Sequence, residues 1–371
     1  MPVGIKQKTM LKRTPFYDLH LELGAKLVEF AGFEMPVQYS SIIEEHLAVR
    51  RSLGVFDVTH MGEFYVRGKS ALEFLQKVTV NDVARLKPGR VQYTAMCYED
   101  GGIIDDLLIY RMEDQYMLVV NASNLQKDFE WLQSQKTGDV VLENVSDATA
   151  LLAVQGPKSL SVLQKLTKEN LSKVEYYSFI HGKLAGVPMI ISRTGYTGEL
   201  GFELYFDADI ETAKNVWKAI FDAGKEFGIQ PIGLGARDTL RLEMGFCLYG
   251  NDIDKTTHPL EAGLGWITKL SKKDFNGRKP MMNAREEGLK RKLVGFTLLD
   301  RTLARHGYEI VYNGNVVGHV TSGTFSPSLK KGIGMGYISA EFADAGTVVN
   351  VRVRDKEIPA TIVVMPFLQN H

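Results

Sequence analysis

The chain has 371 residues, which is too long for one ordinary core and predicts two or three domains. Its 44 basic and 44 acidic residues cancel, so composition gives no electrostatic argument for a nucleic-acid partner. No apolar run is long enough to cross a bilayer, and the start has no apolar signal segment. Only two cysteines occur, Cys97 and Cys247, and both lie among apolar neighbours, as is typical of unpaired core thiols. We therefore expect a cytoplasmic protein that binds neither nucleic acid nor membrane.

Helix starts are the clearest local signals. Ser41, Ser70 and Ser123 are each followed three residues later by Glu or Gln and then by a periodic apolar run, the capping-box pattern. Further helices are predicted over 157–166, 211–227 and 234–244. The β-branched and aromatic segments between them predict strands at 63–66, 91–98, 103–110, 116–121, 151–155, 189–193 and 202–205. Because no βαβ unit with a glycine fingerprint appears, these elements favour an antiparallel α+β arrangement.

The segment 103–110 places two adjacent carboxylates in an apolar strand, just after a turn at Gly101 and Gly102 that should join it to 91–98 as a hairpin. Strand alternation predicts two sets of side chains on opposite faces: Ile103, Asp105, Leu107 and Ile109, and Ile104, Asp106, Leu108 and Tyr110. Whichever face is buried takes a carboxylate with it, and a buried carboxylate needs a partner or a function. Taken alone, hydrogen bonding to local amides explains the pair as well as a functional site does.

The pattern changes near residue 285, where charged residues over 286–292 precede mostly β sequence. Two hairpins are predicted beyond it, one around Asn313-Gly314 and one around 354–356. These indicate a small antiparallel barrel or sandwich. We therefore predict a division into a first region over 1–280 and a C-terminal domain over 285–371.

Two further segments could carry chemistry. Glu203 lies between apolar residues at the start of a strand, after a glycine-rich turn, and such a carboxylate suits a planar ligand edge with two N–H donors; a buried arginine partner is the alternative. Arg237 and Arg241 lie one helical turn apart on one face, where ion pairing with nearby carboxylates is a serious rival to ligand binding.

Other candidates are weaker. His60 has no metal-ligand spacing around it and is expected to be a hydrogen-bonded structural histidine. Ser328 opens an SxxK match, but the glycine-bounded stretch 321–332 favours a surface loop over a nucleophile. The chain contains no P-loop, HExxH, GxGxxG, EF-hand or GxSxG motif, so we expect no metal site.

Several motifs in chain order resemble the glycine cleavage system T-protein family of aminomethyltransferases. The matching segments are FAGFEMPVQY at 30–39, DVTHMGE at 57–63, GGIIDDL at 101–107, GYTGE at 195–199, ARDTLRLE at 236–243, CLYGND at 247–252, TSGTFSPSLKK at 321–331 and MPF at 365–367. The resemblance covers nearly the whole chain. It implies a three-domain ring around a channel for tetrahydrofolate. Two interleaved α+β subdomains over 1–280, mixed antiparallel α/β in structure and folate-binding, are closed into the ring by a C-terminal antiparallel β-barrel.

The resemblance also implies a reaction and its partners. The aminomethyl group on the dihydrolipoyl arm of lipoylated H-protein loses its nitrogen as ammonia. Its one-carbon unit is transferred to tetrahydrofolate, which becomes 5,10-methylenetetrahydrofolate. Neither a metal nor a flavin takes part. A fixed carboxylate in a dry site would stabilise the cationic one-carbon species and orient the attacking amine.

Site residues follow from the resemblance one position at a time. Asp106 matches the catalytic carboxylate, with Asp105 as its structural neighbour, and Glu203 matches the residue that holds the pterin edge. Tyr196 lines the same pocket and Arg237 matches a folate-contacting arginine. The remaining two are a pterin-contacting residue, Asn121, and a channel aromatic, Trp266.

One departure and two alternatives stay open. Some family members carry a ligand-contacting tyrosine near the C-terminus, whereas this chain ends Leu-Gln-Asn-His at 368–371. A folate-binding relative without transferase activity shares the ring fold, but here the Asp-Asp strand and the 236–243 segment are intact. Another folate-dependent one-carbon transferase, such as a methylthio-acid demethylase, is harder to exclude; the related oxidases would carry a flavin domain.

Overall fold

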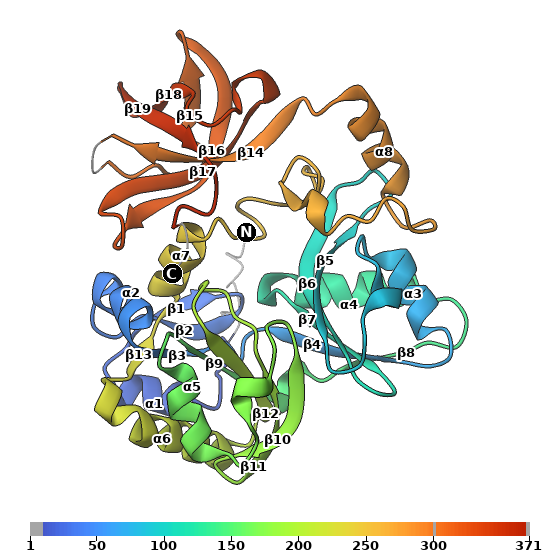
Figure 1. The fold of residues 1–371 in the computed structure, drawn as a ribbon, viewed down its shortest axis with the longest axis vertical. Coiled ribbons are helices and arrows are strands. Elements are labelled where there is room, and N and C mark those ends of the chain that lie inside the picture. The colour runs from blue at the N-terminus through green and yellow to red at the C-terminus, as the bar shows by residue number, and fades with distance from the viewer. Residues whose placement is uncertain (1–9, 300–301, 369–371) are drawn as a thin grey trace, which may run out of the picture.

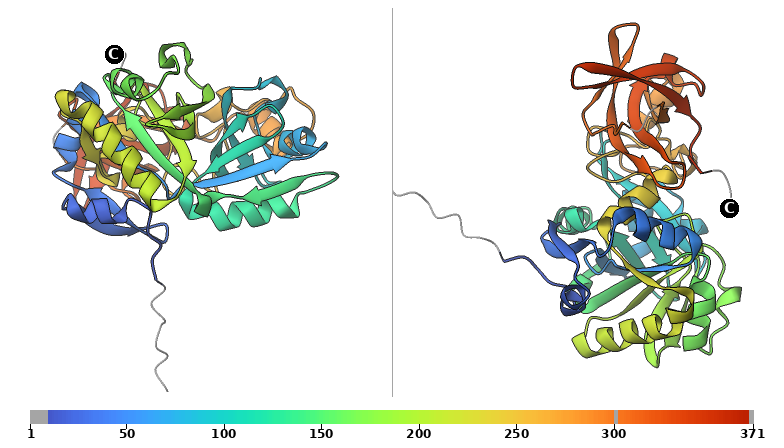
Figure 2. Two further views of the ribbon diagram at one scale, coloured as in Figure 1. Left: turned by 90° about the horizontal axis from the view of Figure 1, so that it is seen from below. Right: turned by 90° about the vertical axis from the view of Figure 1, so that its left-hand side faces the viewer.

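A computed structural model describes residues 10–299 and 302–368, and it divides into three lobes (Figure 1). Two lobes are mixed α/β, and the third is a barrel formed by the last strands of the chain. The right-hand view of Figure 2 shows this barrel at one end of the molecule. Within the described residues, no helix is long and apolar enough to span a membrane.

The first lobe is a five-stranded antiparallel sheet in the order β5-β6-β7-β4-β8. Its strands are β4 (Gly62–Arg67), β5 (Val91–Cys97), β6 (Ile103–Arg111), β7 (Tyr116–Val120) and β8 (Val141–Asn144). Helices α3 (Ala71–Val78) and α4 (Leu125–Ser134) pack their apolar residues against one face of this sheet. The predicted hairpin of 91–98 and 103–110 is confirmed as β5 and β6.

The second lobe is a six-stranded sheet in the order β10-β11-β12-β9-β3-β13, antiparallel except for the pair β13–β3. The strands are β3 (Gly54–Asp57), β9 (Thr149–Gln155), β10 (Phe179–Leu184), β11 (Val187–Ser192), β12 (Gly201–Asp207) and β13 (Gln230–Ile232). Its helices are α1 (Tyr17–Glu22), α2 (Ile42–Arg51), α5 (Ser159–Leu163), α6 (Ile210–Gly224) and α7 (Leu234–Glu243). A two-stranded ribbon of β1 (Lys26–Phe30) and β2 (Phe33–Gln38) lies beside them.

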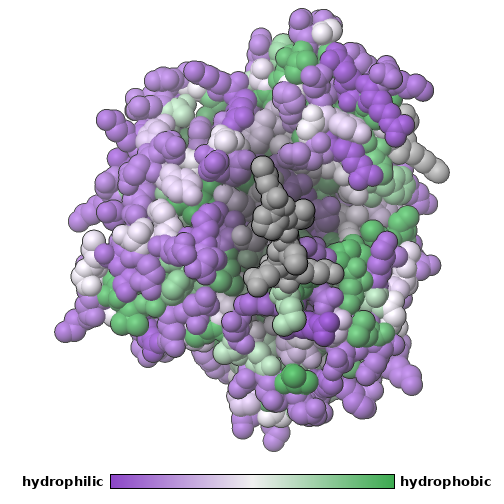
Figure 3. Space-filling view, turned by 180° about the vertical axis from the view of Figure 1, so that it is seen from behind, coloured by the Kyte–Doolittle hydropathy of each residue, from purple (hydrophilic) through white to green (hydrophobic). Residues whose placement is uncertain are grey.

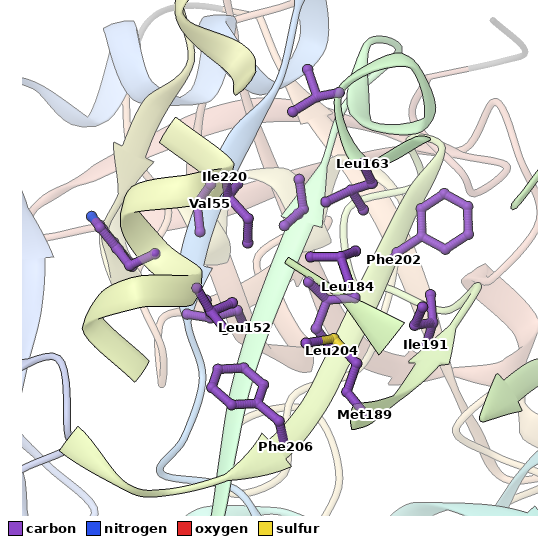
Figure 4. Close-up of a cluster of buried hydrophobic side chains, with 14 of the residues drawn as sticks. Val55, Leu152, Leu163, Leu184, Met189, Ile191, Phe202, Leu204, Phe206 and Ile220 are labelled. Carbon is purple, nitrogen blue, oxygen red and sulfur yellow. The ribbon is translucent and has the colours of Figure 1, made fainter. Parts of the chain in front are cut away.

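The core of the second lobe lies between its sheet and the helices α5 and α6 (Figure 4). Leu152 of β9, Leu204 of β12 and Ile191 of β11 belong to this core together with Ile220 of α6. Burial of apolar surface stabilises a fold by about 25 cal/mol per Å². This cluster is therefore the main source of the stability of the second lobe. This packing fixes β12, the strand that carries Glu203.

The two α/β lobes are interleaved in sequence. The chain passes from β3 in the second sheet directly to β4 in the first, and it returns from β8 to β9. Each crossing ties the two sheets together with a short connection. Residues from both sheets are therefore held at one boundary.

The third lobe is a closed antiparallel barrel in the order β14-β17-β16-β15-β18-β19. The strands are β14 (Arg291–Leu298), β15 (Glu309–Tyr312), β16 (Asn315–Ser326), β17 (Lys331–Ser339), β18 (Val348–Val353) and β19 (Lys356–Val363). Asn313 and Gly314 both have positive φ, 49° and 83°, as a tight two-residue hairpin turn requires. The predicted fold class, α+β with a C-terminal antiparallel β-barrel, is confirmed.

Two local predictions were wrong. Ser41 caps α2 by accepting a hydrogen bond from the Glu44 N–H, as predicted, but Ser70 makes no cap bond and its hydroxyl accepts from Asp139 instead. Ser123 lies inside a 3₁₀ turn (Ala122–Asn124), so α4 begins at Leu125 without a side-chain cap. Just before the barrel the chain forms the helix α8 (Arg278–Glu287), which leads into β14.

Candidate functional site

A cavity of about 810 Å³ lies where the three lobes meet, and all six predicted site residues line it. Side chains come from the first sheet, from the second sheet and α7, and from Leu293 and Met365 on the barrel side. The six are Asp106, Asn121, Tyr196, Glu203, Arg237 and Trp266. Seen from behind, the molecular surface is mainly hydrophilic and is hollowed near its centre (Figure 3).

The hairpin β5–β6 positions Asp106, and a β-bulge in it corrects the predicted alternation. Register shifts between Met96 and Cys97, so that Cys97 pairs with Ile103 while Met96 pairs with Asp105. Ile104 is the extra residue, and it packs with Leu107 in the core under α3 and α4. The prediction that Ile103 shares a face with Asp105 was therefore wrong, whereas the opposite faces of Asp105 and Asp106 are as predicted.

Asp106 is held by two donors at the edge of the cavity. The Tyr93 hydroxyl donates to Asp106 Oδ2 at 2.9 Å, and Asn121 Nδ2 donates to Oδ1 at 2.9 Å. Burial, followed by the charge of Asp105, raises the pKa of Asp106 to about 7. A carboxyl with a pKa near 7 can exchange a proton at neutral pH.

Asp105 points away from the cavity and is fully buried. It accepts from the backbone N–H of Asn121 at 3.0 Å, from Asn121 Nδ2 at 2.9 Å and from Asn124 Nδ2 at 2.6 Å. Asn121 thus bridges the two aspartates. This arrangement fits a structural role for Asp105.

Glu203 occupies the middle of a strand, paired with Ser192 on β11 and Ala153 on β9. Its carboxylate accepts from the Thr194 hydroxyl and, at 3.5 Å, from Tyr205 Oη. Burial raises the pKa of Glu203. A buried carboxylate with one short donor, Thr194, and one distant donor, Tyr205, keeps acceptor capacity for further N–H groups in the cavity.

The two arginines of α7 have different surroundings: Arg237 lines the cavity, and Arg241 does not. The Arg237 guanidinium lies 4.8 Å from the centre of the Tyr196 ring and lines the cavity. Arg241 is buried instead, donating to Asp252 Oδ2 at 2.7 Å and to Ser322 Oγ of the barrel at 2.8 Å. Ion pairing, the rival interpretation, is correct for Arg241.

Sequence reasoning missed Tyr93, Thr194 and Tyr205, the donors to the two cavity carboxylates. Ala95 of β5 lies directly opposite Asp106, and Tyr93 is two residues from Ala95. The bulge therefore brings Tyr93 to the same face of the sheet as Asp106. Thr194 follows the end of β11, and Tyr205 is two residues from Glu203 on the same strand face. Period-2 spacing could have found Tyr205.

Neither of the two weaker candidates, His60 and Ser328, lines the cavity. His60 is buried outside the cavity lining, and burial lowers its pKa to about 4. Its Nδ1 has no hydrogen-bond partner among the described residues, so the expectation of a hydrogen-bonded histidine was wrong for that nitrogen. The stretch 321–332 is not a free loop: it includes the end of β16 and the turn into β17, and Ser328 Oγ donates to Glu243 Oε2 at 3.0 Å. Residues 369–371 of the chain's end lie outside the described residues.

Comparisons with known proteins match the chain along its length. A family model described as the GCVT N-terminal domain matches residues 16–272, and one described as the glycine cleavage T-protein C-terminal barrel domain matches 291–369. An aminomethyltransferase of Halothermothrix orenii is 54% identical over 359 residues, covering 96% of this chain and 100% of that protein. One from Bacteroides fragilis is 56% identical over 361 residues, covering 96% and 99%.

A solved structure agrees with these sequence matches. The crystal structure of glycine cleavage system aminomethyltransferase T from Bartonella henselae has a TM-score of 0.90 at 36% identity, covering 96% of this chain and 98% of that chain. Fold and matches together define a transferase built of two interleaved α+β lobes and a barrel. The chain belongs to the glycine cleavage T-protein family of aminomethyltransferases.

Proposed function

We propose that this chain transfers the one-carbon unit from the aminomethyl-dihydrolipoyl arm of H-protein to tetrahydrofolate and releases ammonia. The observation that carries the proposal is that one hydrogen-bonded carboxylate, Asp106, lines a cavity that also contains the carboxylate of Glu203. Membership of the aminomethyltransferase family supports the same reaction.

The lining of the cavity fits a reduced pterin. The cavity combines aromatic and apolar side chains with a few polar groups, as ligand pockets for planar molecules do. We assign Glu203 to the N–H-bearing edge of the pterin, Tyr196 and Arg237 to its ring, and Asn121 to a polar contact. Tetrahydrofolate supplies the amine nitrogen that receives the one-carbon unit.

Trp266 marks the edge where the cavity reaches the surface. Its side chain lines the cavity but is 63% exposed, and its ring centre lies 5.9 Å from that of Tyr93. An exposed aromatic at a cavity mouth offers an apolar wall to a long ligand. We assign Trp266 to the part of the folate that extends out of the pocket.

Asp106 is proposed to stabilise the positive charge that develops on the one-carbon unit. Expulsion of ammonia from a sulfur-bound aminomethyl group leaves a cationic one-carbon species, and a fixed carboxylate beside it lowers the barrier. The same carboxylate can take the proton of the attacking amine, which its pKa near 7 permits. Tyr93 and Asn121 hold its oxygens so that little reorganisation is needed.

The experiment mixes purified protein with tetrahydrofolate and aminomethyl-loaded H-protein and measures ammonia and methylenetetrahydrofolate. We expect turnover by the parent and a loss of about 100- to 1,000-fold in Asp106→Asn, with tetrahydrofolate binding largely retained. Asp114→Asn, in the exposed turn after β6, is the matched control.

Two results would contradict the proposal. Unchanged turnover in Asp106→Asn removes the catalytic assignment of that carboxylate. Folate binding by the parent without release of ammonia identifies a folate-binding relative or a different one-carbon transferase instead.

A further inference from the structure

Helix α4 brings a third acid against the aspartate pair. Asp128 is fully buried, and none of the described N–H or O–H groups donates to either of its carboxyl oxygens. The group that it meets is the carboxyl of Asp105. Two carboxyl groups can be bonded to each other only when one of them carries a proton.

Among the described residues, one cation, Lys127, is paired with this cluster. Lys127 Nζ is 3.8 Å from Asp128 Oδ1, donates to the backbone carbonyl of Ile104, and donates to Tyr249 Oη at 3.1 Å. From β5, Tyr93 meets the neighbouring Asp106. A single, partly exposed ammonium cannot balance three ionised carboxylates, so like-charge repulsion forces at least one to be neutral.

The neutral member is identified by its partners. Asp105 accepts three hydrogen bonds, two from Asn121 and one from Asn124, which favours its ionised form. Asp106 accepts from Tyr93 and Asn121. Asp128 accepts none from these donors, and burial and Asp105 raise its pKa to about 11.

We propose that Asp128 is a positioning residue that holds a proton, donates it to Asp105, and thereby fixes the acceptor that orients Asn121 against Asp106. The line of hydrogen bonds then runs from Asp128 through Asp105 and Asn121 to Asp106. The effect on catalysis rests on the proposed function, whereas the protonation state of Asp128 does not.

The alternative is a purely structural role, in which Asp128 only fills space in the core under α4. Two substitutions separate the ideas. Asp128→Asn keeps the volume and an N–H donor toward Asp105, so it should mimic the protonated acid and retain at least half of the parent turnover. Asp128→Ala removes the donor and should lower kcat about 10- to 100-fold through misplacement of Asp106, with a smaller change in the KM for tetrahydrofolate.

The pH profile gives a readout that a space-filling role would not move. Without its donor, Asp105 takes up a proton more readily, and the charge that raises the pKa of Asp106 is lost. The acid limb of turnover should shift to lower pH in Asp128→Ala and stay in place in Asp128→Asn. Equal damage in both variants, or an unshifted limb in Asp128→Ala, would overturn the positioning role.

A spectroscopic measurement tests the proton without any substrate. The infrared spectrum of the full-length protein at pH 8 should contain a carbonyl band of protonated carboxylic acids. Glu63, a second buried acid without a donor among the described residues, also contributes to this band, because burial raises its pKa. The test is therefore the difference spectrum: Asp128→Asn should lose one component of the band, and Asp114→Asn should lose none. A difference spectrum between the parent and Asp128→Asn without such a component refutes the proton assignment even if the transferase reaction is confirmed.

Discussion

At the scale of single residues, the sequence could predict that one of two adjacent aspartates serves a special purpose but could not say which. Alternation separates Asp105 from Asp106 without orienting either. The structure orients them: Asp105 faces the helices α3 and α4, and Asp106 lines the cavity. Motif resemblance selected Asp106, and its pKa near 7 gives that residue a measurable signature.

We expect turnover to rise with pH through about pH 7 and to level off above it. The pKa of Asp106 is raised, so the carboxylate that the reaction needs is half formed at about pH 7 and is lost as pH falls. Asp105→Asn removes the neighbouring negative charge, which lowers the pKa of Asp106 and shifts the limb toward acid. The measurement is kcat/KM from pH 5 to 9, and a limb that moves toward alkaline pH in Asp105→Asn would contradict this assignment.

Glu203→Gln should weaken tetrahydrofolate binding on the order of 10- to 100-fold, because an amide turns one of two charged acceptors into a donor. Its NH₂ group would face the Thr194 hydroxyl or the ligand's own N–H groups. Calorimetric titration of the free protein measures the Kd. Glu211→Gln, exposed on α6, serves as control, and undiminished affinity in Glu203→Gln would show that this carboxylate does not clamp the pterin.

At the scale of elements, hairpin signals were dependable and their registers were not. The turn at Gly101–Gly102 predicts the β5–β6 pair, yet an uninterrupted ladder from Cys97–Ile103 would put Thr94 opposite Asp106. The bulge at Ile104 puts Ala95 there instead and so brings Tyr93 to the Asp106 side. A bulge depends on tertiary packing of the extra residue, which local spacing does not encode.

The hairpin is pinned by a close approach at Gly102. A Cβ there would lie 2.1 Å from the backbone oxygen of Lys255, and Ile103 N donates to two carbonyls of the same loop. We expect Gly102→Ala to destabilise the fold by about 1–3 kcal/mol and to lower turnover, because the strand that carries Asp106 must shift. Thermal unfolding and turnover measure both effects.

The matched control for this substitution is Gly265→Ala. Its added Cβ would meet only Leu260, at 3.7 Å, and its φ is not positive, so unfolding should stay within about 0.5 kcal/mol of the parent. If Gly102→Ala unfolded at the parent's midpoint, the loop around Lys255 would have to be mobile enough to yield.

At the scale of the whole molecule, chain length predicted two or three domains and β patterning predicted a small barrel or sandwich. The choice of a barrel and the interleaving of two sheets came only from the family resemblance. Connections such as β3 to β4 carry no local signal that they change sheets. The division at residue 285 stays a prediction. What joins the barrel to the remainder is also non-local: Arg241 and Glu243 of α7 both bind side chains of β16 and the turn that follows it.

The contacts of Glu243 make barrel docking sensitive to acid. Its carboxylate accepts from the Ser328 hydroxyl at 3.0 Å. Burial alone would raise the pKa of Glu243, but His46 Nε2 at 3.1 Å, the Ser326 hydroxyl and Arg50 Nη2 at 2.9 Å outweigh it and lower that pKa to about 2. A pKa below the unfolded value stabilises the fold above about pH 4.5, and that contribution is lost as pH falls toward 2.

Glu243→Gln should therefore lower the free energy of unfolding by up to about 3 kcal/mol at pH 7, and the difference from the parent should shrink steadily between pH 4.5 and 2.5. Urea unfolding across that range measures it, with exposed Glu287→Gln as control. Buried Arg50 keeps Glu199 as a partner at 3.0 Å, so the variant should still fold. A gap that is equal at pH 7 and pH 3 would mean that the neutral acid docks the barrel as well as the carboxylate, and that the hydroxyl contacts rather than the charge hold the lobes together.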